Sequence, residues 1–175
     1  MKRNQGLLRH FLAAIAYRTA KALRDAPPDF DTFAAGQQSR TPRQLVRHMS
    51  GVISYAIGLV TGPRDILTDC SSYAVEVERF FALLRELSDE LRQRVELDDR
   101  AAERLLQGPL ADAMAHAGQL ALLRRLSGSP IPPENFFDAA IDAEHVGLQQ
   151  AAAHSPDDEW PEAPESLSHR PANER

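Results

Sequence analysis

Apolar residues recur at spacings of three and four along several long segments of this 175-residue chain, and this pattern restricts the possible fold more than any other feature. The segments expected to be helical are 4–25, 41–60, 72–95 and 109–126. An apolar stripe of this kind lies on one face of a helix and has to be buried against other helices. The two clearest stripes are Leu45, Met49, Val52, Ala56 and Leu59, and Val77, Phe80, Leu84, Leu87 and Leu91.

Capping and breaking residues divide the chain between these helices. Thr41 is expected to cap the second helix, and Gln44 to complete a capping box with it. A short extra helix is expected over 99–107, with Gly108 and Pro109 as a stop before the fourth long helix. No segment reads convincingly as a strand. Four long helices with compact connections predict an all-α protein, an antiparallel four-helix bundle.

Residues 1–150 are expected to form this helical domain. After the last long helix the segment becomes irregular, although 134–150 contains enough apolar residues for one or two short helices. The remaining residues, 151–175, have the acidic, proline-rich composition of a mobile tail. Trp160 stands out there, because a lone tryptophan in a tail can anchor it to the domain. In the loop before Thr41, Phe30 is expected either to pack on the helices or to act as part of a lid.

Charge and composition exclude some classes of partner. The net charge of −5 argues against binding to nucleic acid or to an anionic membrane by bulk electrostatics. No apolar run approaches the roughly 20 residues of a membrane helix. The single cysteine, Cys70, cannot form an internal disulfide, so a cytoplasmic setting is the simplest expectation. A homodimer formed through an exposed helix face is compatible with all of these features.

Asp112 and His116 lie one helical turn apart in an otherwise apolar helix, and His48 borders the apolar stripe of the second long helix. A carboxylate among apolar residues needs a compensating partner. Two imidazoles and one carboxylate can share a divalent ion and leave coordination positions open, which suits Zn, Ni, Fe or Mn. Simpler interpretations remain: His48 as a hydrogen-bonded interface residue, and Asp112 as a first-turn acid that complements the helix dipole by about 0.3–1 kcal/mol.

Other polar residues near these helices are candidates for the same site. Tyr55 lies two turns beyond His48, and Glu76 borders the apolar stripe of the third long helix. Either could transfer protons, so both are catalytic candidates. Glu76 could also accept a hydrogen bond from a metal ligand, and the simpler interpretation is a favourable acid in a first turn. Gln119, close to one turn past His116, could orient that ligand or be an ordinary interface amide.

Two stretches of the chain resemble the DinB/YfiT-like family of proposed metalloenzymes. They are GPLADAMAHAGQLALLRRLSGSPIPPENFF at 108–137 and TPRQLVRHMSGVISYA at 41–56, and the likeness extends over about residues 5–150. The resemblance implies a four-helix bundle with three metal-binding histidines, one on the second helix and two spaced by four on the fourth. His48 matches the first and His116 the last. Asp112 stands where the middle histidine usually lies, which makes the site harder and more anionic.

The resemblance implies a metal-dependent thiol S-transferase or a hydrolase acting on a small molecule. The ion would activate a low-molecular-weight thiol or a water molecule. The alternative is a non-catalytic stress-response or binding module with a degenerate metal site, and the aspartate at position 112 favours it. Neither the substrate nor the metal follows from the sequence.

Overall fold

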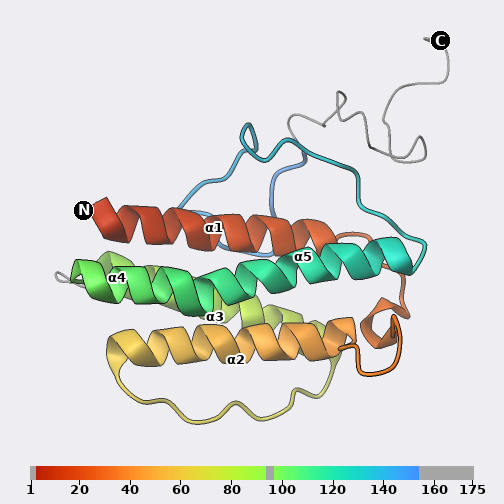
Figure 1. Ribbon diagram of the computed structural model, residues 1–175, viewed down its shortest axis with the longest axis horizontal. Helices are drawn as coiled ribbons and strands as arrows, with labels where there is room; N and C mark the ends of the chain where they lie inside the picture. Colours follow the sequence, from red (N-terminus) through yellow and green to blue (C-terminus); the bar gives the residue numbers. More distant parts are fainter. Residues whose placement is uncertain (1–2, 94–96, 154–175) are drawn as a thin grey trace.

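A computed structural model describes residues 3–93 and 97–153, and within these residues all regular secondary structure is helical. The long helices α1, α2, α3 and α5 lie lengthwise beside one another (Figure 1). The elements are α1 (Arg3–Leu23), η1 (Phe30–Thr32), α2 (Pro42–Thr61), α3 (Tyr73–Gln93), α4 (Asp99–Leu105), η2 (Leu106–Leu110) and α5 (Ala111–Leu126). None of the helices in the described part of the chain combines the length and apolar character of a membrane span.

The start of α2 and the end of α5 follow the sequence prediction. Thr41 Oγ1 accepts a hydrogen bond from the Gln44 amide at 3.3 Å, and the Thr41 amide donates to Gln44 Oε1 at 2.9 Å. This reciprocal pair is the predicted capping box. Gly128 follows α5 with φ of +79°, the left-handed conformation that commonly ends a helix.

The predicted stop at Gly108 and Pro109 is wrong. The π-helical turn η2 carries the chain from α4 into α5 without a break. In an α-helix, a proline lacks the amide that would bond four residues back, and its ring meets that carbonyl. A π-helical turn shifts the pairing by one residue and so accommodates Pro109 inside a continuous helix. The π-helical turn ends at Leu110, directly before α5 and two residues before Asp112.

Helices α2 and α3 run in the same direction, which differs from the antiparallel order expected from compact connections. Ser50, in the first half of α2, bonds to Glu76 in the first turn of α3, and Arg64, just beyond the end of α2, bonds to Glu86 farther along α3. The segment 62–72 returns beside α2 before α3 begins (Figure 1). The 20 residues of α2 span about 30 Å. A fully extended segment as long as 62–72 spans up to about 36 Å, so it can make this return.

Apolar side chains from all the long helices meet in one core. Residues that are at most 1% exposed include Leu12 and Ile15 of α1, Met49 and Ile53 of α2, Phe80, Leu84 and Leu87 of α3, and Leu120 of α5. Each such side chain contributes about 1.5–3 kcal/mol relative to exposure. Phe30 is 1% exposed and belongs to this core, so it packs on the helices and does not form a lid. Leu59 departs from the predicted stripe, because it is 54% exposed.

The segment after α5 contains no helix within the described residues, so the short helices expected over 134–150 are wrong. It passes over α1 in turns and extended stretches (Figure 1). Polar contacts hold it there: Tyr17 Oη donates to Glu134 Oε1 at 2.6 Å, and Arg9 Nη2 donates to Glu144 Oε1 at 2.7 Å. Only isolated apolar residues such as Val146 are buried, so no helical stripe is available. Trp160 lies outside the described residues.

Candidate metal centre

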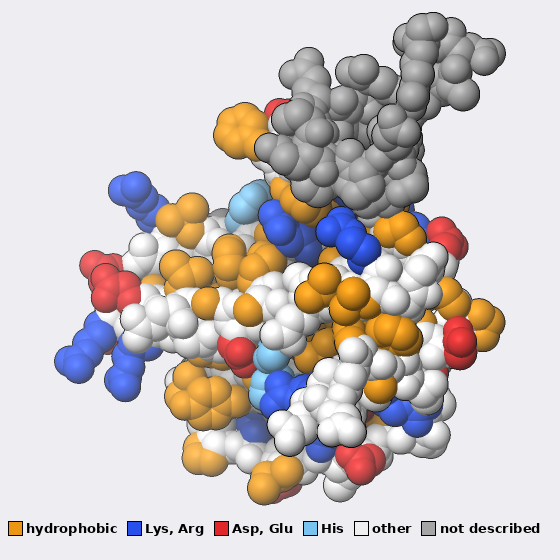
Figure 2. Space-filling model, turned by 45° about the vertical axis from the view of Figure 1, so that its right-hand side comes forward, with side chains coloured by type: hydrophobic (Ala, Val, Ile, Leu, Met, Phe, Trp, Pro, Cys, Tyr) orange, Lys and Arg blue, Asp and Glu red, His pale blue; other side chains and the backbone are white. Residues whose placement is uncertain are grey.

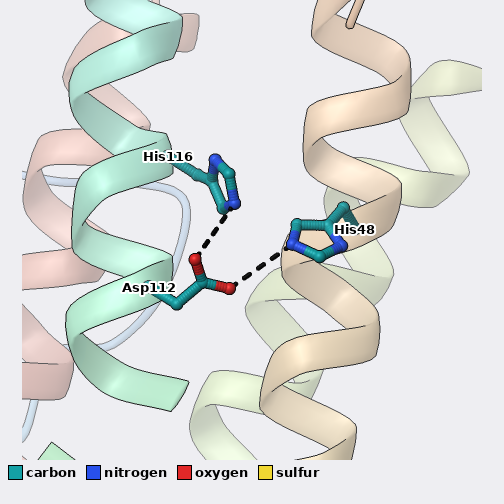
Figure 3. A group of neighbouring side chains, drawn as sticks. All are labelled: His48, Asp112 and His116. Atoms are coloured by element: carbon teal, nitrogen blue, oxygen red, sulfur yellow. Dashed lines mark ion pairs between the residues drawn. The ribbon is translucent and has the colours of Figure 1, made fainter. Parts of the chain in front are cut away.

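His48 of α2 and Asp112 and His116 of α5 come together between these two helices (Figure 3). Asp112 Oδ2 lies 3.4 Å from His48 Nε2, and Asp112 Oδ1 lies 3.3 Å from His116 Nε2. One potential ligand atom from each residue lies within 4.8 Å of the others. The three side chains selected from the sequence therefore form a group that can hold a metal ion.

The local structure of α5 explains this convergence. Asp112 and His116 are four residues apart and so occupy one face of the helix. Directly after each of them comes a buried alanine: Ala113 is 0% exposed and Ala117 is 1% exposed. Side chains this small allow α5 to pack closely on its neighbours. His116 lies at the edge of this buried face, where His48 of α2 reaches it, and the two rings meet edge to face with centroids 4.7 Å apart.

Burial decreases across the group, since the side chains of His116, His48 and Asp112 are 9%, 36% and 46% exposed. Partial burial lowers the pKa of His48, and Arg40 and His116 lower that pKa further, while Asp112 opposes the change. His48 is therefore neutral at neutral pH. A neutral imidazole is the form that binds metal ions.

Gln119 orients His116. Its Oε1 lies 2.8 Å from His116 Nδ1, and an amide oxygen can only accept a hydrogen bond. The proton in this contact therefore belongs to Nδ1, and Nε2 is the ring nitrogen that faces Asp112. Metal-binding histidines commonly have their second ring nitrogen held in this way.

The donor set and its spacing fit a divalent transition-metal ion. Ligands at about 2.0–2.2 Å from a tetrahedral centre are roughly 3.3–3.6 Å apart. The nitrogen–oxygen separations of 3.3 and 3.4 Å involve different oxygens of Asp112. One ligand atom from each residue lies within 4.8 Å of the others, so small side-chain rotations would bring the three to that spacing. Two imidazoles and one carboxylate also leave at least one coordination position for another molecule.

A cavity of about 950 Å³ lies beside the group and is large enough for a small molecule. Its walls come from α2, from η2, from the beginning of α5 and from Arg40, the residue before the α2 cap. Besides His48 and Asp112, the lining includes Arg40, Gln44, Arg47, Gly51, Val52, Tyr55, Gln107, Gly108 and Pro109. On this side of the molecule, histidine side chains reach the surface next to acidic and basic ones (Figure 2).

The two catalytic candidates have different surroundings. Tyr55 is 63% exposed and lines the cavity. Glu76 is buried and does not line it. Instead, its carboxylate accepts hydrogen bonds from Ser50 Oγ at 2.7 Å and from Arg79 Nε at 3.1 Å, and so joins α2 to α3.

Sequence reasoning missed several residues of the cavity. Arg47 lies four residues before Gly51 and eight before Tyr55, so the helical face that carries Tyr55 could have indicated Arg47. No comparable signal existed for Pro109, because its place beside Asp112 depends on the unbroken passage from α4 into α5.

Comparison of the chain with protein-family models, with curated proteins and with solved structures found no match. The group of three side chains and the adjoining cavity are therefore the basis for assigning a function.

Proposed function

We propose that this chain is a DinB-like metal-dependent enzyme that acts on a small molecule, with His48, Asp112 and His116 holding a divalent ion. The observation that carries the proposal is the convergence of these side chains from two helices beside a cavity. The resemblance of 41–56 and 108–137 to that family supports the same ligand set. In this proposal the fold is a four-helix bundle in which α1 and α5 are antiparallel to α2 and α3.

A divalent ion at this site, whether Zn, Ni, Fe or Mn, would lower the pKa of a bound thiol or water and so supply a nucleophile at neutral pH. The reaction is transfer of a low-molecular-weight thiol or hydrolysis. Gln119 keeps His116 Nε2 turned toward Asp112. The carboxylate of Asp112 offsets one positive charge of the ion. Tyr55, on the cavity wall, is placed to exchange a hydrogen bond or a proton with a substrate.

A non-catalytic binding module is the second candidate, and one observation favours it. Asp112 already meets both histidines, with a different carboxylate oxygen toward each. If either ring is protonated, it forms an ion pair with the carboxylate of Asp112, and no metal ion is needed to balance that charge. In that case the group would join α2 to α5 without an ion.

Elemental analysis of untagged protein tests the metal centre directly. We expect about one divalent ion per chain, and we expect its loss in His48→Ala and in His116→Ala. His10→Ala is the matched control, because His10 is an exposed histidine of α1 outside the group. Substoichiometric metal that the two site substitutions leave unchanged would refute the proposal.

Enzymatic activity needs a separate assay. Metal-loaded protein is mixed with a small thiol, such as cysteine, and a chromogenic electrophile, and thiol transfer is followed by absorbance. A parallel assay follows hydrolysis of a chromogenic ester or amide. Turnover that requires the ion and disappears in His116→Ala supports the enzyme. A fully loaded site without turnover in either assay favours the binding module.

A further inference from the structure

We propose that the molecule bound at the metal centre carries an apolar chain or ring, and that this part occupies a groove between α2 and the segment 62–72. The inference rests on the proposed function and adds the substrate class: a small amphiphile with a polar reacting group. It depends on four features of the groove, which are its continuity with the site, its apolar lining, its anchored wall and its open floor.

The groove adjoins the metal-side cavity. It has a volume of about 510 Å³. Arg47, Gly51 and Tyr55 line both hollows, so the two meet along α2. A molecule that reaches the three metal-binding side chains can therefore extend past Gly51 without leaving the surface depression.

Large apolar side chains line the groove and are exposed to solvent. Tyr55, Leu59 and Ile66 are 63%, 54% and 94% exposed. A single exposed apolar residue is ordinary, but several that share one hollow indicate a binding surface. The metal side of the depression is more polar than the groove, since Arg40, Gln44 and Asp112 line it beside apolar residues such as Val52. This change in polarity along α2 fits a ligand with a polar head and an apolar tail.

The outer wall of the groove is anchored to the helices. Arg47 donates hydrogen bonds to the carbonyl of Leu67 and, at 3.1 Å, to Asp69 Oδ1. Arg79 Nη1 donates to the carbonyl of Thr68 at 2.6 Å. The segment 62–72 is thus held at successive residues, and the hollow between it and α2 exists without a ligand.

Two glycines form the floor. Gly51 and Gly58 are seven residues apart and so lie on the same face of α2. A Cβ atom at Gly51 would meet nothing within 4 Å, and one at Gly58 would meet Arg64 Cγ at 3.8 Å, an ordinary contact. Packing therefore does not require glycine at either position. Each glycine lowers the stability of the helix by about 0.5–1 kcal/mol relative to alanine. The two glycines leave open space above the helix.

A series of alkyl hydroxamates tests the inference. The hydroxamate group chelates metal ions, and the tail is lengthened from acetohydroxamate through butano- and hexano- to octanohydroxamate. Dissociation constants for the zinc-loaded protein are measured by calorimetry. We expect each added methylene to tighten binding about two- to fourfold.

The double variant Leu59→Gln/Ile66→Gln should lose this dependence on chain length. Both residues are exposed and line only the groove, so folding and acetohydroxamate binding should not change. Leu122→Gln is the matched control, because Leu122 is 51% exposed on α5 and lines neither hollow. The control should keep the full chain-length dependence.

Three results would overturn the inference, and they are distinguishable from one another. If acetohydroxamate binds only with metal but longer tails bind no better, the groove is not used and the metal centre stands. If the double variant keeps the same chain-length dependence as the control, the tail binds elsewhere. If acetohydroxamate shows no zinc-dependent binding, the proposed metal centre fails and this inference fails with it.

Discussion

Two carboxylates next to α2 have very different surroundings. Asp112 faces α2 from α5, has a side chain that is 46% exposed, and lies between two imidazoles. Glu76 faces α2 from α3, has a side chain that is 3% exposed, and is bound by the guanidinium of Arg79 and the hydroxyl of Ser50. Arg79 neutralises the charge of Glu76, whereas the carboxylate of Asp112 faces two imidazoles and lines a cavity that a cation can enter.

The comparison separates a polar group that holds the fold together from one that is available for binding. Glu76 connects α3 to Ser50 of α2, and Arg79 connects α3 to the carbonyl of Thr68, so this largely buried ion pair holds neighbouring parts of the chain together. The group around Asp112 opens into a cavity and has weak, long contacts. We therefore expect substitutions in the first region to lower stability, and substitutions in the second to alter binding.

The largest effect is expected for Arg79→Ala. Removing the guanidinium leaves the buried carboxylate of Glu76 without its cation, which should cost about 3 kcal/mol of unfolding free energy. Asp112→Ala removes only the contacts of a half-exposed carboxylate with two imidazoles and should cost less than about 1 kcal/mol. Urea unfolding of both variants measures the difference. Equal losses would mean that the two regions do not differ in this way.

Added metal should stabilise the Arg79→Ala variant as it does wild-type protein, but should not stabilise a variant of the metal centre. An ion that binds only the folded protein at 100 times its dissociation constant stabilises it by about 2.7 kcal/mol. For a chain of this size, that corresponds to a rise in Tm of roughly 5–10 °C. Thermal unfolding with zinc and with EDTA should show the rise in wild-type protein and in Arg79→Ala, but not in His116→Ala. A rise of the same size in His116→Ala would contradict the assigned ligands.

A second buried pair, Tyr17 with Glu134, allows a test by pH. Burial, together with the hydrogen bond to Glu134, raises the pKa of Tyr17 from 10.0 to about 12. A raised pKa means that the phenol proton contributes stability below pH 10, and that this contribution is lost as the pH rises through about 12.

Tyr17→Phe should therefore cost about 1–2 kcal/mol at neutral pH and flatten the fall in stability between pH 10 and 12. Urea unfolding at several alkaline pH values measures both effects. The same alkaline slope in the variant and in wild-type protein would show that the Tyr17 hydroxyl is not its source.

The smallest effect is expected on the open face itself. Gly51→Ala should raise stability by about 0.5–1 kcal/mol, because a Cβ there meets no atom within 4 Å and alanine favours a helix. Gly62→Ala is the contrasting control, since φ of +113° at Gly62 is unfavourable for alanine, and stability should fall. Calorimetric Tm values distinguish the two. A loss of stability in Gly51→Ala would mean that the floor of the groove is packed.

Local patterns were sufficient to predict the long helices and the shared helical face of Asp112 and His116. Spacings of three and four depend only on the geometry of one helix, so they located α1, α2, α3 and α5 and placed Asp112 and His116 on one face. The capping box between Thr41 and Gln44 is equally local. Each of these features is determined by residues within one or two turns of one another.

The tertiary structure decided the features that depend on residues far apart in the chain. The return of 62–72 along α2 sets the direction of α3, pairs Glu76 with Ser50, and builds the groove beside Leu59. The π-helical turn brings Pro109 beside the cavity. Helical periodicity shows which face of a helix is buried, but not which neighbour covers it or in which direction that neighbour runs. Those choices depend on the packing of the whole chain.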